Sequence, residues 1–303
     1  MNIVKHRNIF FAITGALVFA SLVSLFAFGL HFGIDFTGGT LVQVRYEGVR
    51  PAHDVLQRNL EDAGFTGISL RETGTDGYTL RTATLTDAQR NNLGAYFSYQ
   101  GGTGHIDQLT EIGPTIGKEL RNKSFVALLL VLLCILLFIA FAFRKVSQPV
   151  SSWMYGVIAL VALLHDLIVP MGFFALLGYL TGASVDTLFV TAILTILGFS
   201  IHDTIVVFDR VRENLRINQE KNRKEDFSET AGRSLGQTFV RSVNTSLTVL
   251  FTLLVLYFIG PASTRDFALT LLVGITAGTY SSIFLATPLL VTVEKWRRKS
   301  VRG

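Results

Sequence analysis

The chain has 303 residues, of which 50% are hydrophobic and only 16% charged, and its mean hydropathy is +0.46. A composition this apolar excludes a soluble globular domain of the same length and indicates a membrane protein. The net charge of +5 does not indicate a nucleic-acid partner, because the basic residues stand mostly in short segments between apolar runs. The single cysteine, Cys134, excludes an intrachain disulfide.

Six apolar runs are long enough to cross a membrane as helices, which takes about 20 residues. They predict transmembrane helices at Ile9–Leu30, Phe125–Phe143, Val150–Leu180, Leu188–Phe208, Phe239–Ile259 and Phe267–Val293. The first run follows basic residues, as a signal peptide would, but it is about twice as long as the apolar region of one. We therefore interpret it as an uncleaved anchor.

Basic residues between the runs predict the orientation of the helices. They cluster in four segments: Lys5 to Arg7, Arg144–Lys145, Arg210 to Arg233, and Lys295 to Arg302. The short loops of the opposite side contain only Arg265. By the positive-inside rule, we expect a multi-pass protein with both termini in the cytoplasm. We interpret the charged segment 209–237 as a solvated cytoplasmic helical linker, with the docking of a partner as the alternative.

Residues 32–123 are therefore expected outside the cytoplasm, where their mixed charge and periodicity fit a small soluble domain. Strands are predicted at 41–46, 68–71, 78–82 and 105–112, and helices around 55–63 and 87–99. This order, β-α-β-β-α-β, is that of a ferredoxin-like unit. About 90 residues are enough for a core of its own.

The predicted fold is thus a polytopic α-helical membrane protein with six transmembrane helices and a small α+β ferredoxin-like external domain. Residues 1–31 contain the first helix with a cytoplasmic N-terminus, 32–123 form the external domain, and 124–303 contain helices two to six. The loop between helices four and five is expected in the cytoplasm with the C-terminus.

Two opposite charges lie inside consecutive apolar runs. Asp203 precedes Asp209 by six residues, about 9 Å along a helix, and Arg241 follows Arg233 by eight, about 12 Å. Their similar depths on antiparallel helices predict that they can pair. One interpretation is a static buried ion pair. The other, which we favour, is a carboxylate that takes up and releases protons as burial and the nearby guanidinium change its proton affinity.

A polar stripe begins at the same arginine. Its members share one helical face: Arg241, Asn244, Thr245, Thr248 and Thr252. Such a stripe is expected to face the bundle interior or water rather than lipid. It would form either the wall of a polar cavity or a set of hydrogen bonds that hold helices together.

His165 and Asp166 form a second polar pair inside an apolar run. A proton relay and a structural hydrogen bond are equally compatible with this pair. His202 precedes Asp203, but neighbouring residues of a helix point about 100° apart, so a structural role is favoured for it. Gly274 and Gly278 fit the G-x-x-x-G pattern of closely packed helices.

The segment that leads from the first helix into the external domain contains Gly33, Asp35, Gly38 and Gly39. Glycines permit positive φ angles and therefore a tight junction. The junction is either a fixed bend or a hinge that transmits motion. No Cys/His cluster has metal-site spacing and no nucleophile motif is present, so we predict no metal, no cofactor and no enzymatic activity.

Several of these motifs resemble the SecF family, the membrane subunits of the bacterial Sec protein-export machinery in the resistance–nodulation–division superfamily. The resemblance covers nearly the whole chain and is carried by Gly33–Thr40, His165–Asp166, Ile201–Asn214, Arg241–Leu247 and Phe267–Pro288. It implies that the chain works with SecD and uses the proton-motive force to aid protein translocation across the inner membrane. In this family an acid of helix four and an arginine of helix five serve proton coupling, and they match Asp203 and Arg241. His202 replaces the asparagine expected before that acid.

The resemblance also implies a set of partners. Superfamily members carry two six-helix halves, so SecD is expected to supply the second half and complete the proton path. The other implied partners are the SecYEG channel, the translocating preprotein, protons and the lipid bilayer, with no nucleic acid. The alternative function is a structural scaffold that stabilises the translocon without using protons. An exporter half for small solutes or lipids is disfavoured, because about 90 external residues are few for a substrate pocket.

Overall fold

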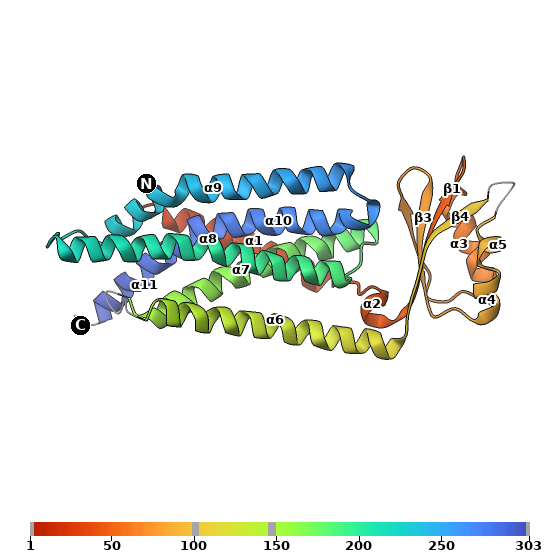
Figure 1. The fold of residues 1–303 in the computed structure, drawn as a ribbon, viewed down its shortest axis with the longest axis horizontal. Helices are drawn as coiled ribbons and strands as arrows, with labels where there is room; N and C mark the ends of the chain where they lie inside the picture. Colours follow the sequence, from red (N-terminus) through yellow and green to blue (C-terminus); the bar gives the residue numbers. More distant parts are fainter. Residues whose placement is uncertain (1–2, 99–102, 145–149, 301–303) are drawn as a thin grey trace. The chain divides into compact units, whose positions relative to one another are not determined.

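The computed structural model describes residues 3–98, 103–144 and 150–300 (Figure 1). Tyr99, Lys145 and Arg302, on which sequence predictions were made, lie outside the described residues. The chain divides into two compact units. The helical unit contains Met1–Gly29, Ala127–Leu176 and Phe189–Gly303, and the sheet unit contains Leu30–Val126 and Leu177–Leu188.

Six helical paths of the described residues are long and apolar enough to cross a membrane, and each overlaps one predicted run. They are α1 (Arg7–Phe28), α6 (Pro114–Ala142), α7 (Ser152–Thr181), α8 (Thr187–Glu220), α9 (Phe227–Ile259), and a last path of η1 (Ala262–Thr264), α10 (Arg265–Ser281), η2 (Ser282–Ala286) and α11 (Thr287–Ser300). The predicted number of transmembrane helices is thus confirmed. Several helices extend beyond the predicted runs, because hydropathy reports only the apolar part of a helix.

The charged segment between α8 and α9 is helical, as predicted from its composition, but it is not solvated on all sides. Both helices continue into it and pair side by side, so that only residues 221–226 connect them. Phe227 and Leu235 are 4% and 0% exposed. Asn214 Nδ2 of α8 donates hydrogen bonds to Ser234 Oγ and Gln237 Oε1 of α9, each at 2.8 Å. The polar residues of this segment therefore bind each other across a helix pair.

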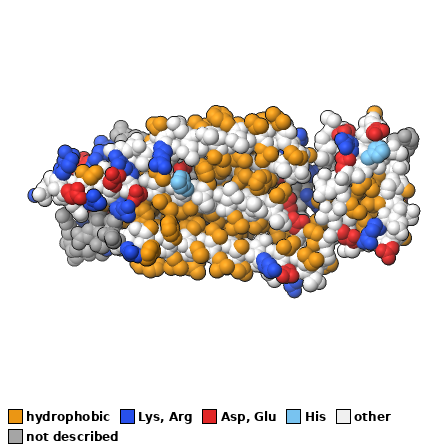
Figure 2. Space-filling view, in the orientation of Figure 1, with side chains coloured by type: hydrophobic (Ala, Val, Ile, Leu, Met, Phe, Trp, Pro, Cys, Tyr) orange, Lys and Arg blue, Asp and Glu red, His pale blue; other side chains and the backbone are white. Residues whose placement is uncertain are grey.

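The basic segments of the helical unit lie together at one end. The Arg212 guanidinium is 5.6 Å from the ring centroid of Phe143, at the end of α6. Arg298 of α11 pairs with Asp226, just before α9, at 3.2 Å. Figure 2 shows Lys and Arg side chains gathered at one end of this unit. This arrangement agrees with the predicted grouping of basic segments, and their location in the cytoplasm stays a prediction.

The sheet unit contains a four-stranded antiparallel sheet with strand order β2-β3-β1-β4. Its elements are α2 (Ile34–Thr37), β1 (Gly39–Tyr46), α3 (His53–Asp62), β2 (Ser69–Thr73), β3 (Gly77–Thr82), α4 (Asp87–Asn91), α5 (Leu93–Tyr96) and β4 (Gly104–Ile112). Alternate residues of β1 are buried, and Val42 stands opposite Leu80 in a core that also holds Leu56, Leu60 and Phe97. The α+β character is therefore as predicted.

The strands and helices follow one another in the predicted order, and the likeness to ferredoxin-like domains stays a prediction. Two elements differ, because the short helix α2 was not predicted and the single helix predicted around 87–99 is divided into α4 and α5. Asn92 separates them, and its Nδ2 donates to the carbonyl of Ala88 at 3.1 Å. A side chain that binds nearby backbone competes with helix continuation, and Gly94 weakens the second part further.

Candidate functional site

Asp203 of α8 is 2% exposed within the helical unit. Its side chain accepts a hydrogen bond from a hydroxyl group, Ser246 Oγ of α9, which lies 3.5 Å from Asp203 Oδ2. Ser246 Oγ in turn accepts a hydrogen bond from Thr279 Oγ1 of α10 at 2.6 Å. Hydroxyl groups from two neighbouring helices thus connect to the buried carboxylate.

A second buried carboxylate, Asp166 of α7, is 0% exposed. Its Oδ1 lies 2.8 Å from His165 Nδ1. Its Oδ2 accepts hydrogen bonds from Ser281 Oγ of α10 at 2.8 Å and from Ser200 Oγ of α8. His165 is 3% exposed, and its Nε2 has no hydrogen-bond partner in the part of the chain that the structure describes. The pair therefore makes a structural hydrogen bond and leaves one ring nitrogen available, so the relay role stays a prediction.

Both carboxylates are linked to α10, Asp166 directly through Ser281 and Asp203 indirectly, because Thr279 donates to the Ser246 hydroxyl. Ser200 and Asp203 are three residues apart on α8, and Thr279 and Ser281 are two apart on α10. Because one helical turn takes 3.6 residues, Ser200 and Asp203 lie on nearly the same face of α8. We define Asp166, Asp203, Ser200, Ser246, Thr279, Ser281 and His165 as the hydroxyl–carboxylate cluster.

Close packing of α8 and α10 brings this cluster together. A Cβ atom added to Gly278 would lie 3.0 Å from Ser200 Cβ, and one added to Gly274 would lie 2.1 Å from Ile196 Cδ1. The G-x-x-x-G pattern thus allows the close approach that was predicted for it. A π-helical stretch, η2, begins directly after Ser281. Such stretches are rare and are found frequently at functional sites.

Arg241 does not contact Asp203 in this structure. No ion pair joins the two among the described residues, and Arg241 is exposed on α9. The face of α9 that packs inward instead contains Thr238, Ser242, Ser246 and Leu253. Similar depth in the membrane was therefore not enough to predict pairing, because depth does not fix the rotation of a helix about its axis.

The rest of the predicted polar stripe also faces away from the bundle of this chain. Asn244, Thr248 and Thr252 are exposed and Thr245 is half-buried. The three threonines donate to carbonyls four residues earlier on α9, at 2.9 to 3.1 Å. Of the two surroundings expected for this stripe, the bundle interior and water, the interior of this chain's own bundle does not contain it. The outward direction of the stripe is compatible with contact to water or to a second helical half.

Sequence reasoning missed the hydroxyl members of the cluster: Ser200, Ser246, Thr279 and Ser281. Ser242 and Ser246, spaced four residues apart, could have indicated a second polar face of α9, about 100° around the helix from the first stripe. His202 is exposed on α8 and is not among the hydrogen-bond partners recorded for Asp203. Within the described ranges, no three His, Cys, Asp or Glu side chains meet as a metal site requires.

The predicted junction segment forms a tight set of backbone contacts inside the sheet unit. Gly33 N donates to Val185 O at 2.7 Å, and Val185 N donates to His31 O at the same distance. Asp35 Oδ2 accepts two hydrogen bonds from Thr187, the first residue of α8. The junction is thus attached to the segment that leads into α8.

Gly38 and Gly39 have φ angles of +78° and +128°, which favour glycine. An added Cβ would lie 2.7 Å from Pro114 Cα at the first position and 2.5 Å from Thr82 O at the second. Only glycine fits this turn without moving the backbone. The turn is therefore tight, as predicted, and whether it acts as a fixed bend or as a hinge stays a prediction.

Comparison with known proteins identifies relatives of the junction segment and of the helices that follow the sheet. Residues 95–296 match the family "Protein export membrane protein SecD/SecF, C-terminal", and residues 23–48, which include the junction, match the "SecD/SecF GG Motif". The chain is 43% identical to the protein translocase subunit SecF of Thermobaculum terrenum, over 97% of this chain and 94% of that one. It is 34% identical to the SecF subunit of Pseudomonas aeruginosa, over 96% and 90% of the two chains.

A solved structure is similar as well. The crystal structure of SecDF, a translocon-associated membrane protein from Thermus thermophilus, superposes with a TM-score of 0.84 at 34% identity and covers 97% of this chain. The chain spans only 39% of that longer protein. This chain therefore matches one part of the longer SecDF chain.

Proposed function

Because the chain belongs to the SecF family of protein translocase subunits, we propose that it acts with SecD to promote protein export by using the proton-motive force. Membership of this family gives the chain an auxiliary role in the Sec translocase. The proposal adds the energy source, the SecYEG channel and the exported preprotein as partners, and a place in the cytoplasmic membrane with both termini in the cytoplasm. The grouping of the basic segments at one end of the helical unit supports this orientation.

The observation that carries the proposal is the burial of Asp203 without a paired cation among the described residues. A carboxylate in a low-dielectric interior is costly when ionised, and a single weak hydrogen bond from a hydroxyl does not neutralise it. Such a group binds a proton until a cation or water reaches it. Arg241 lies on the next helix and is exposed, so a rotation or shift of α9 would change the distance between the two charges.

The outward-facing polar stripe supports the need for a second half. Arg241, Asn244 and Thr248 are exposed on a helix long and apolar enough to span a membrane, where polar side chains facing lipid are costly. In the Thermus thermophilus relative named SecDF, a region 38% identical to this chain occupies only 37% of the protein. We propose that SecD covers this stripe and that the proton path runs between the two proteins.

The test uses inverted membrane vesicles that contain the chain with its partner. Asp203→Asn should abolish the part of preprotein translocation that depends on an imposed proton gradient, because the amide cannot exchange a proton. Arg241→Met should do the same, with Arg241→Lys as the variant that keeps the charge. Gradient-dependent translocation at the unmodified level in Asp203→Asn would refute proton coupling.

The scaffold function makes the opposite prediction for the same variants. A scaffold needs the shape of the buried site but not its titration, so Asp203→Asn would retain export as long as the complex assembles. Assembly is measured separately, by purifying each variant through an added tag and quantifying the partner that copurifies. Full assembly together with lost gradient dependence therefore distinguishes the two functions.

A further inference from the structure

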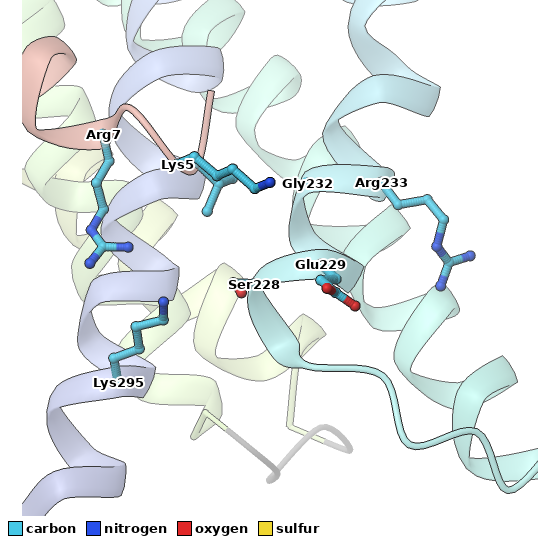
Figure 3. Close-up of a pocket in the computed structure, with 8 residues that line it drawn as sticks. Lys5, Arg7, Ser228, Glu229, Gly232, Arg233 and Lys295 are labelled. Atoms are coloured by element: carbon cyan, nitrogen blue, oxygen red, sulfur yellow. The ribbon is translucent and has the colours of Figure 1, made fainter. Parts of the chain in front are cut away.

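A cavity of about 570 Å³ opens at the end of the helical unit where the basic segments meet. It is bounded by the residues just before α1, by the first turns of α9 and by α11 (Figure 3). Segments from three distant parts of the sequence thus form one site. Nothing in the proton-coupling proposal uses it.

The lining of this cavity has an excess of positive charge. Lys5, Arg7 and Lys295 line it, and none of the three has a carboxylate partner among the described residues. Glu229 is the one carboxylate of the lining. The fourth cation, Arg233, is paired with Glu225 at 2.6 Å, and Figure 3 shows it extending away from Lys5. The cavity therefore holds more positive charge than its own residues neutralise.

Cations held around one cavity favour an anion that accepts several hydrogen bonds. Ammonium and guanidinium groups bind phosphate oxygens through charge-assisted hydrogen bonds. The first turn of α9, at Ser228 and Glu229, also contributes the positive end of a helix. Phosphate is thus the group that this lining would hold best.

The surroundings of the cavity indicate that the phosphate belongs to a lipid. Arg7 is the first residue of α1, and Ile9, two residues further on this apolar helix, is 58% exposed. Trp296 follows Lys295 and is 69% exposed. Tryptophan is enriched at the level of lipid headgroups, and basic pockets at the cytoplasmic ends of transmembrane helices hold anionic headgroups. Exposed apolar side chains thus begin within one or two residues of the cavity lining along α1 and α11.

We propose that this cavity binds the phosphate of an anionic phospholipid of the phosphatidylglycerol type, with Lys5, Arg7 and Lys295 as its ligands. The lipid would connect the N-terminal segment to α11 and to the start of α9. The site lies outside the hydroxyl–carboxylate cluster, so it can be tested independently of proton coupling.

The test is native mass spectrometry of the full-length chain in detergent, titrated with phosphatidylglycerol. Phosphatidylcholine and inorganic phosphate are titrated in parallel. We expect phosphatidylglycerol to bind about tenfold or more tightly than phosphatidylcholine, and the triple variant Lys5→Gln, Arg7→Gln, Lys295→Gln to lose that preference. Displacement of the lipid by millimolar inorganic phosphate would instead show a site for the free ion and would overturn the lipid assignment.

A matched control removes three positive charges outside the cavity, with Arg212→Gln, Arg216→Gln and Lys221→Gln. It should keep the preference for phosphatidylglycerol, and an equal loss in this control would refute a localised site. Glu229→Gln removes the one carboxylate of the lining and should strengthen lipid binding, a gain that misfolding does not produce. Unchanged binding in both the triple variant and Glu229→Gln would refute the proposal.

Discussion

Asp35 Oδ2 accepts hydrogen bonds from Thr187 N at 2.8 Å and from Thr187 Oγ1 at 2.7 Å. Thr187 begins α8, so a side chain from the junction after α1 binds a backbone N–H group that the first turn of this helix leaves unsatisfied. Negative charge at this end also complements the helix dipole. α8 is the helix that carries Asp203 further along. The junction residue therefore fixes the start of the helix on which the proposed proton site depends.

Replacing Asp35 tests this cap. Asp35→Ala removes the acceptor of both hydrogen bonds and should destabilise the first turn of α8 by about 1–2 kcal/mol. Hydrogen exchange of the amides at 187–190 in the full-length chain should then be faster by about five- to thirtyfold. Asp35→Asn keeps an acceptor oxygen and should have a smaller effect. Equal exchange in Asp35→Ala and the unmodified chain would show that the cap contributes nothing.

Gly274 tests the close packing that assembles the hydroxyl–carboxylate cluster. The Cβ atom of Gly274→Ala would overlap Ile196, at 2.1 Å from Cδ1 and 2.5 Å from Cγ1, so the Ile196 side chain or one of the two helices must move. We expect a loss of about 1–3 kcal/mol in stability, measured as a lower Tm in detergent. Because Ser281 on α10 binds Asp166 on α7, gradient-dependent export should also fall.

Gly198 provides the matched control for this substitution. It lies on α8, and an added Cβ would meet nothing within 4 Å. Alanine is a better helix former than glycine, so Gly198→Ala should leave the Tm unchanged or raise it slightly. A similar loss of Tm in both variants would mean that the effect of Gly274→Ala does not come from contact between α8 and α10.

The predictions from the sequence succeeded where a single physical signal was sufficient. Apolar length predicted the six helices, since a hydrocarbon core demands about 20 residues whatever the neighbouring helices do. The glycines at 38 and 39 indicated a backbone that other residues avoid, and the positive φ angles confirm it. Alternation of side chains located the first strand of the sheet unit, in which alternate residues are buried.

The arrangement around Asp203 could not be predicted in the same way. Periodicity shows which residues of α9 share a face, but α9 has two polar faces, one beginning at Arg241 and the other at Ser242. Which face packs inward depends on the surfaces of α8 and α10, where small residues permit contact. The charge makes Arg241 the partner that the sequence favours, whereas the structure places Ser246 beside Asp203.

The pairing of the charged ends of α8 and α9 makes stability depend on pH. Glu225 Oε2 accepts hydrogen bonds from Arg233 Nη2 at 2.6 Å, Asn218 Nδ2 at 2.6 Å and Thr230 Oγ1 at 2.8 Å. These partners, Arg233 above all, hold the pKa of the Glu225 carboxyl below its ordinary value of 4.5, against the opposing effect of burial. A depressed folded-state pKa stabilises the protein above the unfolded value, and this stabilisation is lost as the pH falls through the folded-state pKa.

We therefore expect the Tm of the full-length chain to fall on acidification from about pH 7 to about pH 3.5, and to fall less in Glu225→Gln. The glutamine variant should also be less stable at neutral pH, by about 1 kcal/mol, because it loses the charge-assisted hydrogen bond from Arg233. Glu220→Gln is the control, since the pair of Glu220 with Arg216 is exposed and such pairs contribute little. Its Tm should follow the unmodified chain at every pH. The same acid dependence in Glu225→Gln would show that another carboxylate is responsible.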